Sequence, residues 1–203
     1  MQKRLSTMKK LIKENGSLWP NNYIIGSEDS SLFPPNETLK DYYKLLDKKC
    51  DENAIHNFIA QHPVMLAYMM YGGKGNWVFS KPKLGDKYVP DFLMCTQDSG
   101  GFHWVLVELE SPNKKVLRKD GQQTAYLSTA IKQINEWRIW IRKNISYARH
   151  ELGFIDIDAE CPALIIIGRR KNISQDIKEY YRELSNDKLK IMSYDRLAFD
   201  MSE

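Results

Sequence analysis

One short segment, residues 104–110, constrains the fold more than any other part of the chain. It reads Trp-Val-Leu-Val-Glu-Leu-Glu, and the four residues before Glu108 are apolar on both faces of a strand. Such a strand belongs in the middle of a sheet that is covered on both sides. A charged group there costs roughly several kcal/mol unless a metal or another cation compensates it. Glu108 therefore predicts a compensated site.

A second acid occurs in a comparable place. Asp91 follows Pro90 in a predicted strand over 87–95, and it precedes Glu108 by 17 residues. If the two strands are neighbours, both carboxylates meet at one point beside the sheet. Mg²⁺ usually takes one or two carboxylates together with waters and substrate phosphates. Strand alternation puts Glu110 on the same side as Glu108, so it is a third candidate.

The composition bounds the class of protein. The 203 residues suffice for one domain with a real core, or for a domain with a small appendage. A net charge of +4 permits nucleic-acid binding without demanding it. Three widely spaced cysteines predict free thiols of a cytoplasmic protein. The four histidines lack zinc-ligand spacing, and we expect neither a signal peptide nor a membrane span.

The order of predicted elements indicates an α/β fold. Short helices come first, then three strands, a long helix, a strand, a helix and a last strand, which is typical of a mixed sheet. The predicted helices cover 1–15, 39–46 (capped by Thr38), 52–62, 64–71, 122–150 and 174–184. The predicted strands cover 77–80, 87–95, 103–110, 162–168 and 189–193, with a hairpin turn at 98–101 and an irregular connection at 16–37.

Five sequence blocks in this order resemble a known nuclease family. They are VPDFLM, VLVELESP, AIKQINEW, ALIIIGRR and MSYDRL. Together they resemble the PD-(D/E)xK superfamily, and more closely the nuclease domain of Shedu-type antiphage defence proteins. The resemblance covers roughly residues 40–200. It implies a restriction endonuclease-like mixed β-sheet flanked by helices over 41–203, preceded by a basic helical N-terminal extension over 1–40.

The resemblance also implies roles for individual residues. Asp91 and Glu108 would bind Mg²⁺, with Mn²⁺ as a substitute. Gln133 would reach the site from the long helix, and Glu52 would point at it from an earlier helix. Each has an ordinary alternative: a turn acid, an acid at a strand end, an exposed helix residue, and an acid that a helix N-terminus favours.

The chain departs from the superfamily pattern at Glu110, where a lysine is expected. Glu110 is therefore either part of the site or simply the exit of its strand. The missing cation could come from the following loop, where Lys119 is the first choice and Lys115 the second. Without such a lysine the domain would be slow or inactive.

A basic cluster, Arg169-Arg170-Lys171, follows the predicted strand that ends at Gly168. Together with Lys115 it would contact DNA phosphates, since basic side chains position a protein on nucleic acid. The alternative is a solvated turn.

These observations predict a Mg²⁺-dependent DNA endonuclease of the bacterial cytoplasm that serves defence against phage, with a phage component as its trigger. The rival is a nuclease-fold module that binds DNA or assembles without cleaving. A third reading is a structural partner that oligomerises through the long helix. That helix, about 28 residues and roughly 42 Å long, exceeds what one small sheet needs. A symmetric homo-oligomer, a dimer or tetramer, would also suit double-strand cutting.

Overall fold

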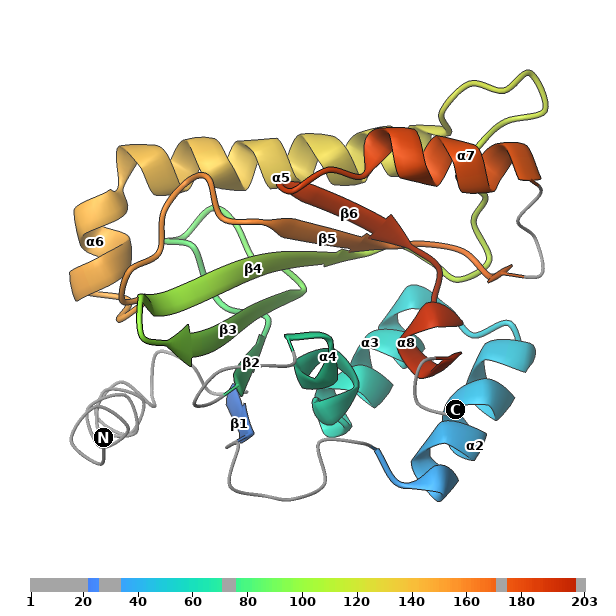
Figure 1. Ribbon diagram of the computed structural model, residues 1–203, viewed down its shortest axis with the longest axis horizontal. Helices are drawn as coiled ribbons and strands as arrows, with labels where there is room; N and C mark the ends of the chain where they lie inside the picture. The colour runs from blue at the N-terminus through green and yellow to red at the C-terminus, as the bar shows by residue number, and fades with distance from the viewer. Residues whose placement is uncertain (1–21, 26–33, 71–75, 171–174, 200–203) are drawn as a thin grey trace.

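The computed structural model describes residues 22–25, 34–70, 76–170 and 175–199, and Figure 1 shows their arrangement. The predicted helix over 1–15 lies outside this range. Among the described helices, none is long and apolar enough to cross a membrane.

A single six-stranded sheet forms the middle layer, in the order β1-β2-β3-β4-β5-β6. The pairs β1–β2, β2–β3 and β3–β4 are antiparallel, whereas the pairs β4–β5 and β5–β6 are parallel. The predicted mixed α/β sheet is confirmed, and the apolar segment lies in β4, between β3 and β5. The strands are β1 (Asn22–Ile25), β2 (Asn76–Ser80), β3 (Phe92–Asp98), β4 (Gly101–Leu109), β5 (Ala163–Ile166) and β6 (Leu189–Met192).

Helices cover both faces of this sheet (Figure 1). The long helix α5 and the helix α7 lie over one face, and the short helices α2, α3, α4 and α8 lie against the other. The helices are α2 (Asn36–Asp47), α3 (Glu52–Gln61), α4 (Val64–Ala67), η1 (Tyr68–Met70), α5 (Ala125–Lys143), α6 (Ile145–His150), α7 (Gln175–Leu184) and α8 (Arg196–Phe199).

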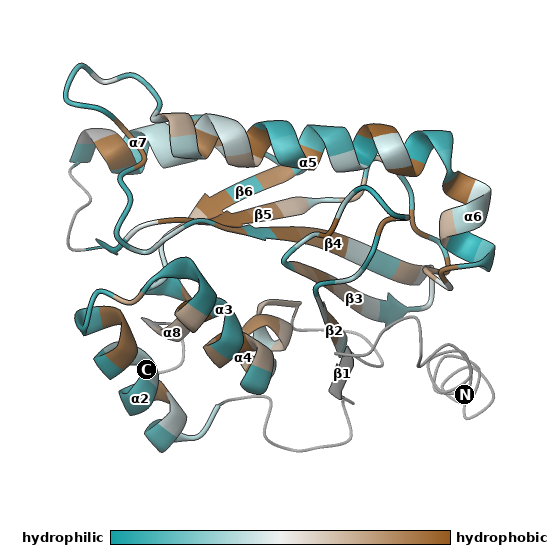
Figure 2. Cartoon of the chain, turned by 180° about the vertical axis from the view of Figure 1, so that it is seen from behind, coloured by the Kyte–Doolittle hydropathy of each residue, from teal (hydrophilic) through white to brown (hydrophobic). Residues whose placement is uncertain are grey.

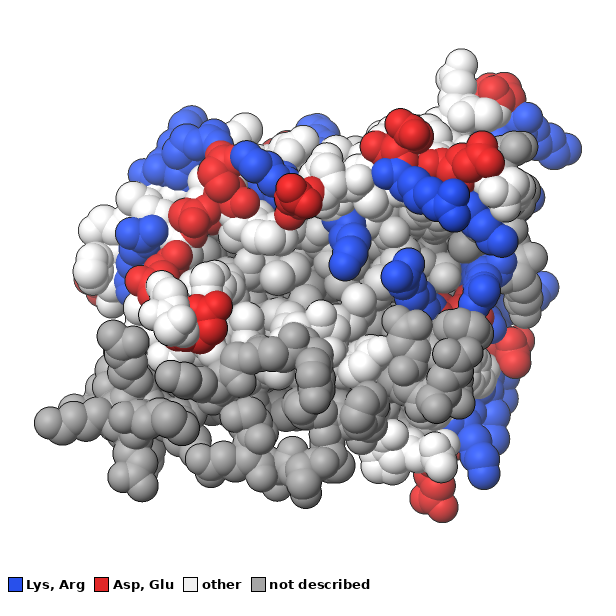
Figure 3. Space-filling view, in the orientation of Figure 1, with Lys and Arg blue, Asp and Glu red and all other residues white. Residues whose placement is uncertain are grey.

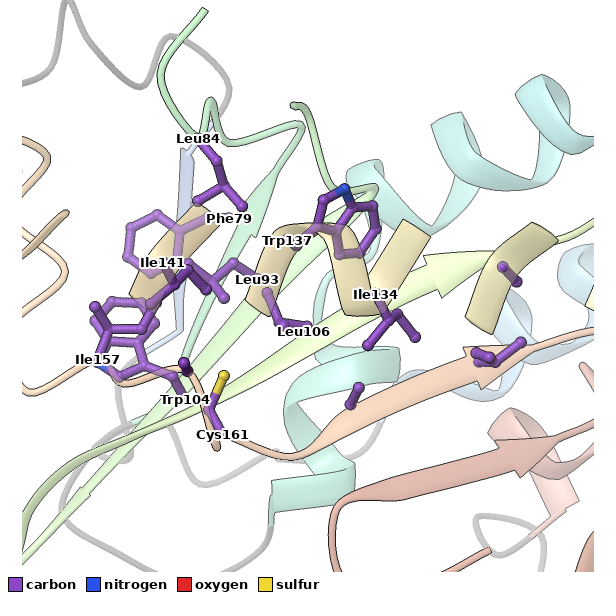
Figure 4. Packing of buried hydrophobic residues seen from close by; sticks show 14 of the residues in the cluster. Phe79, Leu84, Leu93, Trp104, Leu106, Ile134, Trp137, Ile141, Ile157 and Cys161 are labelled. Atoms are coloured by element: carbon purple, nitrogen blue, oxygen red, sulfur yellow. The ribbon is translucent and has the colours of Figure 1, made fainter. Parts of the chain in front are cut away.

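Strand alternation divides the interior into two cores. On one face, Leu93 and Leu106 pack beneath Ile134 and Trp137 of α5, as Figure 4 shows. The intervening residues point to the other face, where Phe92, Val107 and Leu109 meet Ile55 and Ile59 of α3. Figure 2 shows the same division, with apolar strands between helices whose outer sides are hydrophilic.

The predicted single helix over 122–150 is wrong, because the chain turns at Asn144. That residue leaves helical geometry with φ −125° and ψ 30°, and its side-chain amide donates to the carbonyl of Trp140 at 2.8 Å. Asn competes for backbone hydrogen bonds in this way and so favours helix ends. Helix α5 has 19 residues, so within this described segment no 28-residue helix extends beyond the sheet to support self-association, and Trp137 is buried in the chain's own core.

The N-terminal part of the sheet also differs from prediction. Strand β1 lies in the segment expected to be irregular, and β3 begins at Phe92 because residues 84–88 form a tight turn instead. Helix α2 starts at Asn36 after Pro35, so Thr38 lies inside the helix rather than capping it. The expected domain boundary at residue 41 thus falls within α2. That helix is bonded to the body, since the Tyr42 hydroxyl donates to the carbonyl of Tyr194 at 2.9 Å.

Candidate active site

The pairing register of β3 and β4 brings the two predicted acids together. Phe92 pairs with Val107 in an antiparallel ladder, so the next residues outward, Asp91 and Glu108, face each other. Both are buried, at 5% and 6% exposure. Oδ2 of Asp91 accepts the backbone N–H of Leu109 at 2.7 Å.

Glu108 holds a proton near neutral pH. Burial raises the pKa of Glu108 to about 10, and the charge of Asp91 and the hydrogen bond to it act in the same direction. A hydrogen bond between two carboxyl groups requires one proton, since an ionised carboxylate only accepts. Without a divalent cation, Asp91 and Glu108 therefore act as a pair with a single negative charge.

Two further acids adjoin this pair. Glu110 is 9% exposed, and burial together with the charges of Glu52 and Asp91 raises its pKa to about 7. Glu52 is half-buried, and burial followed by the charge of Asp91 raises its pKa as well. We call Glu52, Asp91, Glu108 and Glu110 the acidic cluster.

Helix α3 delivers Glu52 to this cluster because of how the helix starts. The side chain of Asp51 accepts the backbone N–H of Ala54 at 2.7 Å, which is an N-cap. Glu52 is the first helical residue after that cap. Its position next to the strand ends thus follows from the cap and from the packing of Ile55 and Ile59 below the sheet.

His56, one turn further along α3, fixes the backbone beside the pair. Its ring stacks on Phe92 with centroids 4.7 Å apart, and Nε2 lies 3.4 Å from the carbonyl oxygen of Asp91. Burial lowers the pKa of His56, and the charge of Lys81 lowers it further. The histidine is packed against the strand that leads into the site.

Two lysines that the sequence reasoning missed lie at the acidic cluster. Lys81 forms an ion pair with Oδ1 of Asp91, and its charge lowers the pKa of both Glu108 and Glu52. Lys114 acts in the same way on Glu110 and Glu52. Its Nζ donates to the hydroxyl of Tyr126 at 2.8 Å and lies 4.0 Å from the centre of that ring.

The structure does not bring the two predicted lysines to the cluster. Lys119 is exposed in the loop between β4 and α5, which extends away from the body in Figure 1. Lys115 is exposed as well, and its carbonyl accepts the hydroxyl of Thr124 at 2.8 Å. In the described part of the chain, the lysine charges that act on the clustered carboxyls belong to Lys81 and Lys114.

Gln133 lies half-buried on α5, one residue before the buried Ile134. Helix α5 covers the face of the sheet toward which Glu108 points, because Leu106, two residues earlier, packs beneath the same helix. The predicted glutamine is therefore on the correct side of the sheet.

The predicted DNA-contacting residues differ in their exposure and in their bonding partners. Arg169 is 6% exposed and forms ion pairs with Asp195 at 2.9 Å and Asp47 at 3.2 Å, which does not fit a phosphate contact. Arg170 is exposed, and its backbone N–H donates to Asp195 at 2.6 Å. Lys171 lies outside the described residues. Figure 3 shows Lys and Arg side chains along the right-hand end of the molecule.

The donor atoms of the acidic cluster fit a hard divalent cation. Asp91 and Glu108 place two buried carboxyl groups side by side, and Mg²⁺ is commonly held by one or two carboxylates with waters and phosphates completing its shell. Among the described residues, no group of three or more His, Cys, Asp or Glu side chains is arranged to hold a metal. The fit is thus to a two-carboxylate site.

A cavity of about 610 Å³ lies elsewhere, at the start of β4, and its lining includes Phe102, His103 and Asp156. It contains no member of the acidic cluster. The carboxyl groups whose pKa values are raised lie instead at the strand ends, and such shifts are typical of functional sites.

Comparison with known families agrees with the sequence blocks. The family described as Shedu protein SduA, C-terminal, matches residues 49–198, a range that includes the whole acidic cluster and both lysines beside it. No curated protein matches the sequence. The chain therefore belongs to the Shedu family and is a Shedu-type antiphage defence protein.

Proposed function

We propose that this chain is a metal-dependent endodeoxyribonuclease that hydrolyses phosphodiester bonds in antiphage defence. The observation that carries the proposal is the buried Asp91–Glu108 pair at the ends of β3 and β4. Two carboxyls that share a proton in an apolar setting are costly, which is expected of a site that becomes complete only with its cation.

The residues of the acidic cluster have separate roles. Asp91 and Glu108 would hold Mg²⁺, or Mn²⁺ in its place, and Glu108 would have to be ionised to do so. When bound, the ion supplies Lewis-acid stabilisation of the charge that develops on the phosphate. Glu110 and Glu52 lie beside the pair and can accept hydrogen bonds from water. Gln133 reaches the same site from α5.

DNA binding is a further part of the proposal. The net charge of +4 and the exposed Lys115 and Arg170 supply sequence-independent phosphate contacts, to which Lys171 would add. Binding of this kind weakens steeply with salt, because it depends on the release of counterions from the DNA.

The test incubates the full chain with plasmid and linear DNA in Mg²⁺, in Mn²⁺ and in EDTA. We expect metal-dependent cleavage by the wild type and its loss in Asp91→Asn and in Glu108→Gln. Glu151→Gln, which changes an exposed carboxylate after α6, is the matched control and should cleave normally. Cleavage by both site variants at the wild-type rate would place the nuclease site elsewhere.

The rival function is a nuclease-fold module that binds DNA or assembles without cleaving it. The observation that favours it is Glu110, an acid where the superfamily pattern has a lysine. Salt-sensitive DNA binding by a wild type that cleaves in neither metal would support this reading.

Self-association is proposed on the resemblance alone, since the helix-length argument fails. We expect a dimer or tetramer in the bacterial cytoplasm, with a phage component as the trigger. Light scattering across a dilution series should give the mass of at least two chains.

A further inference from the structure

We propose that Lys81 replaces the lysine that the superfamily pattern has at position 110. The proposal rests on the proposed nuclease function and names a catalytic cation of that same site. Lys81 lies in the connection between β2 and β3, far in sequence from the loop after β4.

The strand register places Lys81 beside Asp91. Ser80 pairs with Phe92, so the antiparallel ladder of β2 and β3 puts Lys81 opposite Asp91, and the backbone N–H of Lys81 donates to the Asp91 carbonyl at 2.9 Å. Asp91 in turn lies opposite Glu108 across β3 and β4. Lys81, Asp91 and Glu108 therefore form one row across three neighbouring strands.

All three residues of this row are on one face of the sheet. Phe79 and Leu106 each precede a member of the row by two residues, and both belong to the core beneath α5. Strand alternation places Glu108 on this side, and the ion pair with Oδ1 of Asp91 brings the ammonium group of Lys81 to the same pair. A residue at position 110 would also project there, which explains how a lysine from the β2–β3 connection can serve the same space.

The backbone of Lys81 supports a role for its side chain. Its φ of +50° lies in the left-handed region, which non-glycine residues adopt uncommonly. Such conformations persist where surrounding contacts impose them, and they gather at functional sites. Here the backbone hydrogen bond and the ion pair with Asp91 both hold the residue. The side chain remains 42% exposed although it pairs with the buried Asp91.

Lys114 is the competing candidate, and its geometry is less suitable. Its ammonium group is bound to the hydroxyl and ring of Tyr126, on the side of Glu110 and Glu52. The lysine charge that acts on Glu108 is that of Lys81. Only Lys81 contacts the Asp91–Glu108 pair directly among the described lysines.

The reaction assigns a defined task to this ammonium group. The oxygen of a water molecule forms a bond to phosphorus while the bond from phosphorus to the leaving sugar oxygen breaks. The water loses one proton to solvent, and the leaving oxygen gains one from solvent. Lys81 donates hydrogen bonds to a non-bridging phosphate oxygen and stabilises the negative charge that develops there.

The same arrangement makes Lys81 the counterion of Asp91 until a divalent cation binds. Removing the ammonium group should therefore affect two measurements in opposite ways. Cleavage should fall, because the phosphate loses its donor. Metal binding should be retained or become tighter, because Mn²⁺ would no longer compete with a lysine for the Asp91 carboxylate.

The experiment compares Lys81→Met, Lys81→Arg and Lys114→Met with Lys83→Met as the matched control. Lys83 is exposed in the same connection, two residues further on. Single-turnover cleavage of DNA is measured at saturating Mn²⁺, and Mn²⁺ binding is measured by calorimetry on the same full-length proteins. Urea unfolding verifies that each variant folds.

We expect Lys81→Met to cleave about 10²-fold more slowly or worse while binding Mn²⁺ at least as tightly as the wild type. Lys81→Arg should keep part of the rate, and Lys83→Met should keep all of it. Wild-type cleavage with an unimpaired Lys81→Met variant would overturn this inference alone. The same holds if Lys114→Met loses the rate instead, or if Lys81→Met no longer binds Mn²⁺. A wild type that never cleaves would overturn the proposed function itself.

Discussion

Replacing Glu108 by Gln should stabilise the metal-free protein at neutral pH. Glu108 keeps its proton in the folded chain up to a pKa of about 10, whereas its ordinary value is 4.5. Between these values the folded state binds one proton more than the unfolded state, so the free energy of unfolding falls as pH rises. Below about pH 4.5 both states are protonated and the effect vanishes. Gln cannot ionise, yet its amide can still donate a hydrogen bond to Asp91.

The magnitude follows from the linkage relation. One proton of difference changes the free energy of unfolding by about 1.4 kcal/mol per pH unit. Between about pH 5 and about pH 7 the advantage of Glu108→Gln should therefore grow by about 2–3 kcal/mol. In a chain of this size that corresponds to a rise in Tm of roughly 5–10 °C.

The assay is urea unfolding in EDTA, followed by tryptophan fluorescence at several pH values. Glu151→Gln is again the control and should track the wild type within about 0.5 kcal/mol, as surface changes do. Parallel pH curves for Glu108→Gln and the wild type would refute the reasoning, since they would mean that Glu108 ionises alike in both states.

Addition of metal should narrow or close this gap in stability. A cation that binds only the folded state stabilises it by about 2.7 kcal/mol at a concentration of 100 Kd. Wild-type protein should gain this in Mg²⁺ or Mn²⁺, whereas Glu108→Gln should gain less, because an amide is a poorer ligand than a carboxylate. Equal gains in both proteins would show that the cation binds without Glu108.

Two further changes test the surroundings of the site. Gly168→Ala should lower the free energy of unfolding in urea by about 1–3 kcal/mol. A Cβ would lie 2.7 Å from the carbonyl oxygen of Lys114, and Gly168 has a φ of +71°. An unchanged urea midpoint would mean that the loop after β4 shifts at little cost in free energy. Glu110→Lys should raise the stability in EDTA by about 1 kcal/mol after solvent screening, because it removes an acid that faces Glu52, and it should restore part of the cleavage lost in Lys81→Met. No gain in either measurement would contradict the view that position 110 and Lys81 serve one space.

The sequence by itself predicted the class of fold and the meeting of two acids. Both follow from local patterns, because alternation and an apolar run on both faces identify a central strand without knowledge of its partners. The same run makes Glu108 conspicuous, since a lone acid in such a strand needs a partner. Asp91 could be paired with it because β3 and β4 are joined by a short hairpin, which keeps their register local.

Only the tertiary structure decided the remaining features of the site. Lys81 reaches Asp91 through the pairing of β2 with β3, and a left-handed residue cannot be read from local periodicity. Arg169 resembles an exposed basic residue until Asp47 and Asp195, distant in sequence, enclose it. The helix breaks at Asn144, where the side-chain amide bonds the carbonyl of Trp140. The preference of Asn for such a bond is too weak to predict a helix end within a long helical pattern. In each case the deciding contact joins groups whose proximity is set by packing, and packing acts on the whole chain at once.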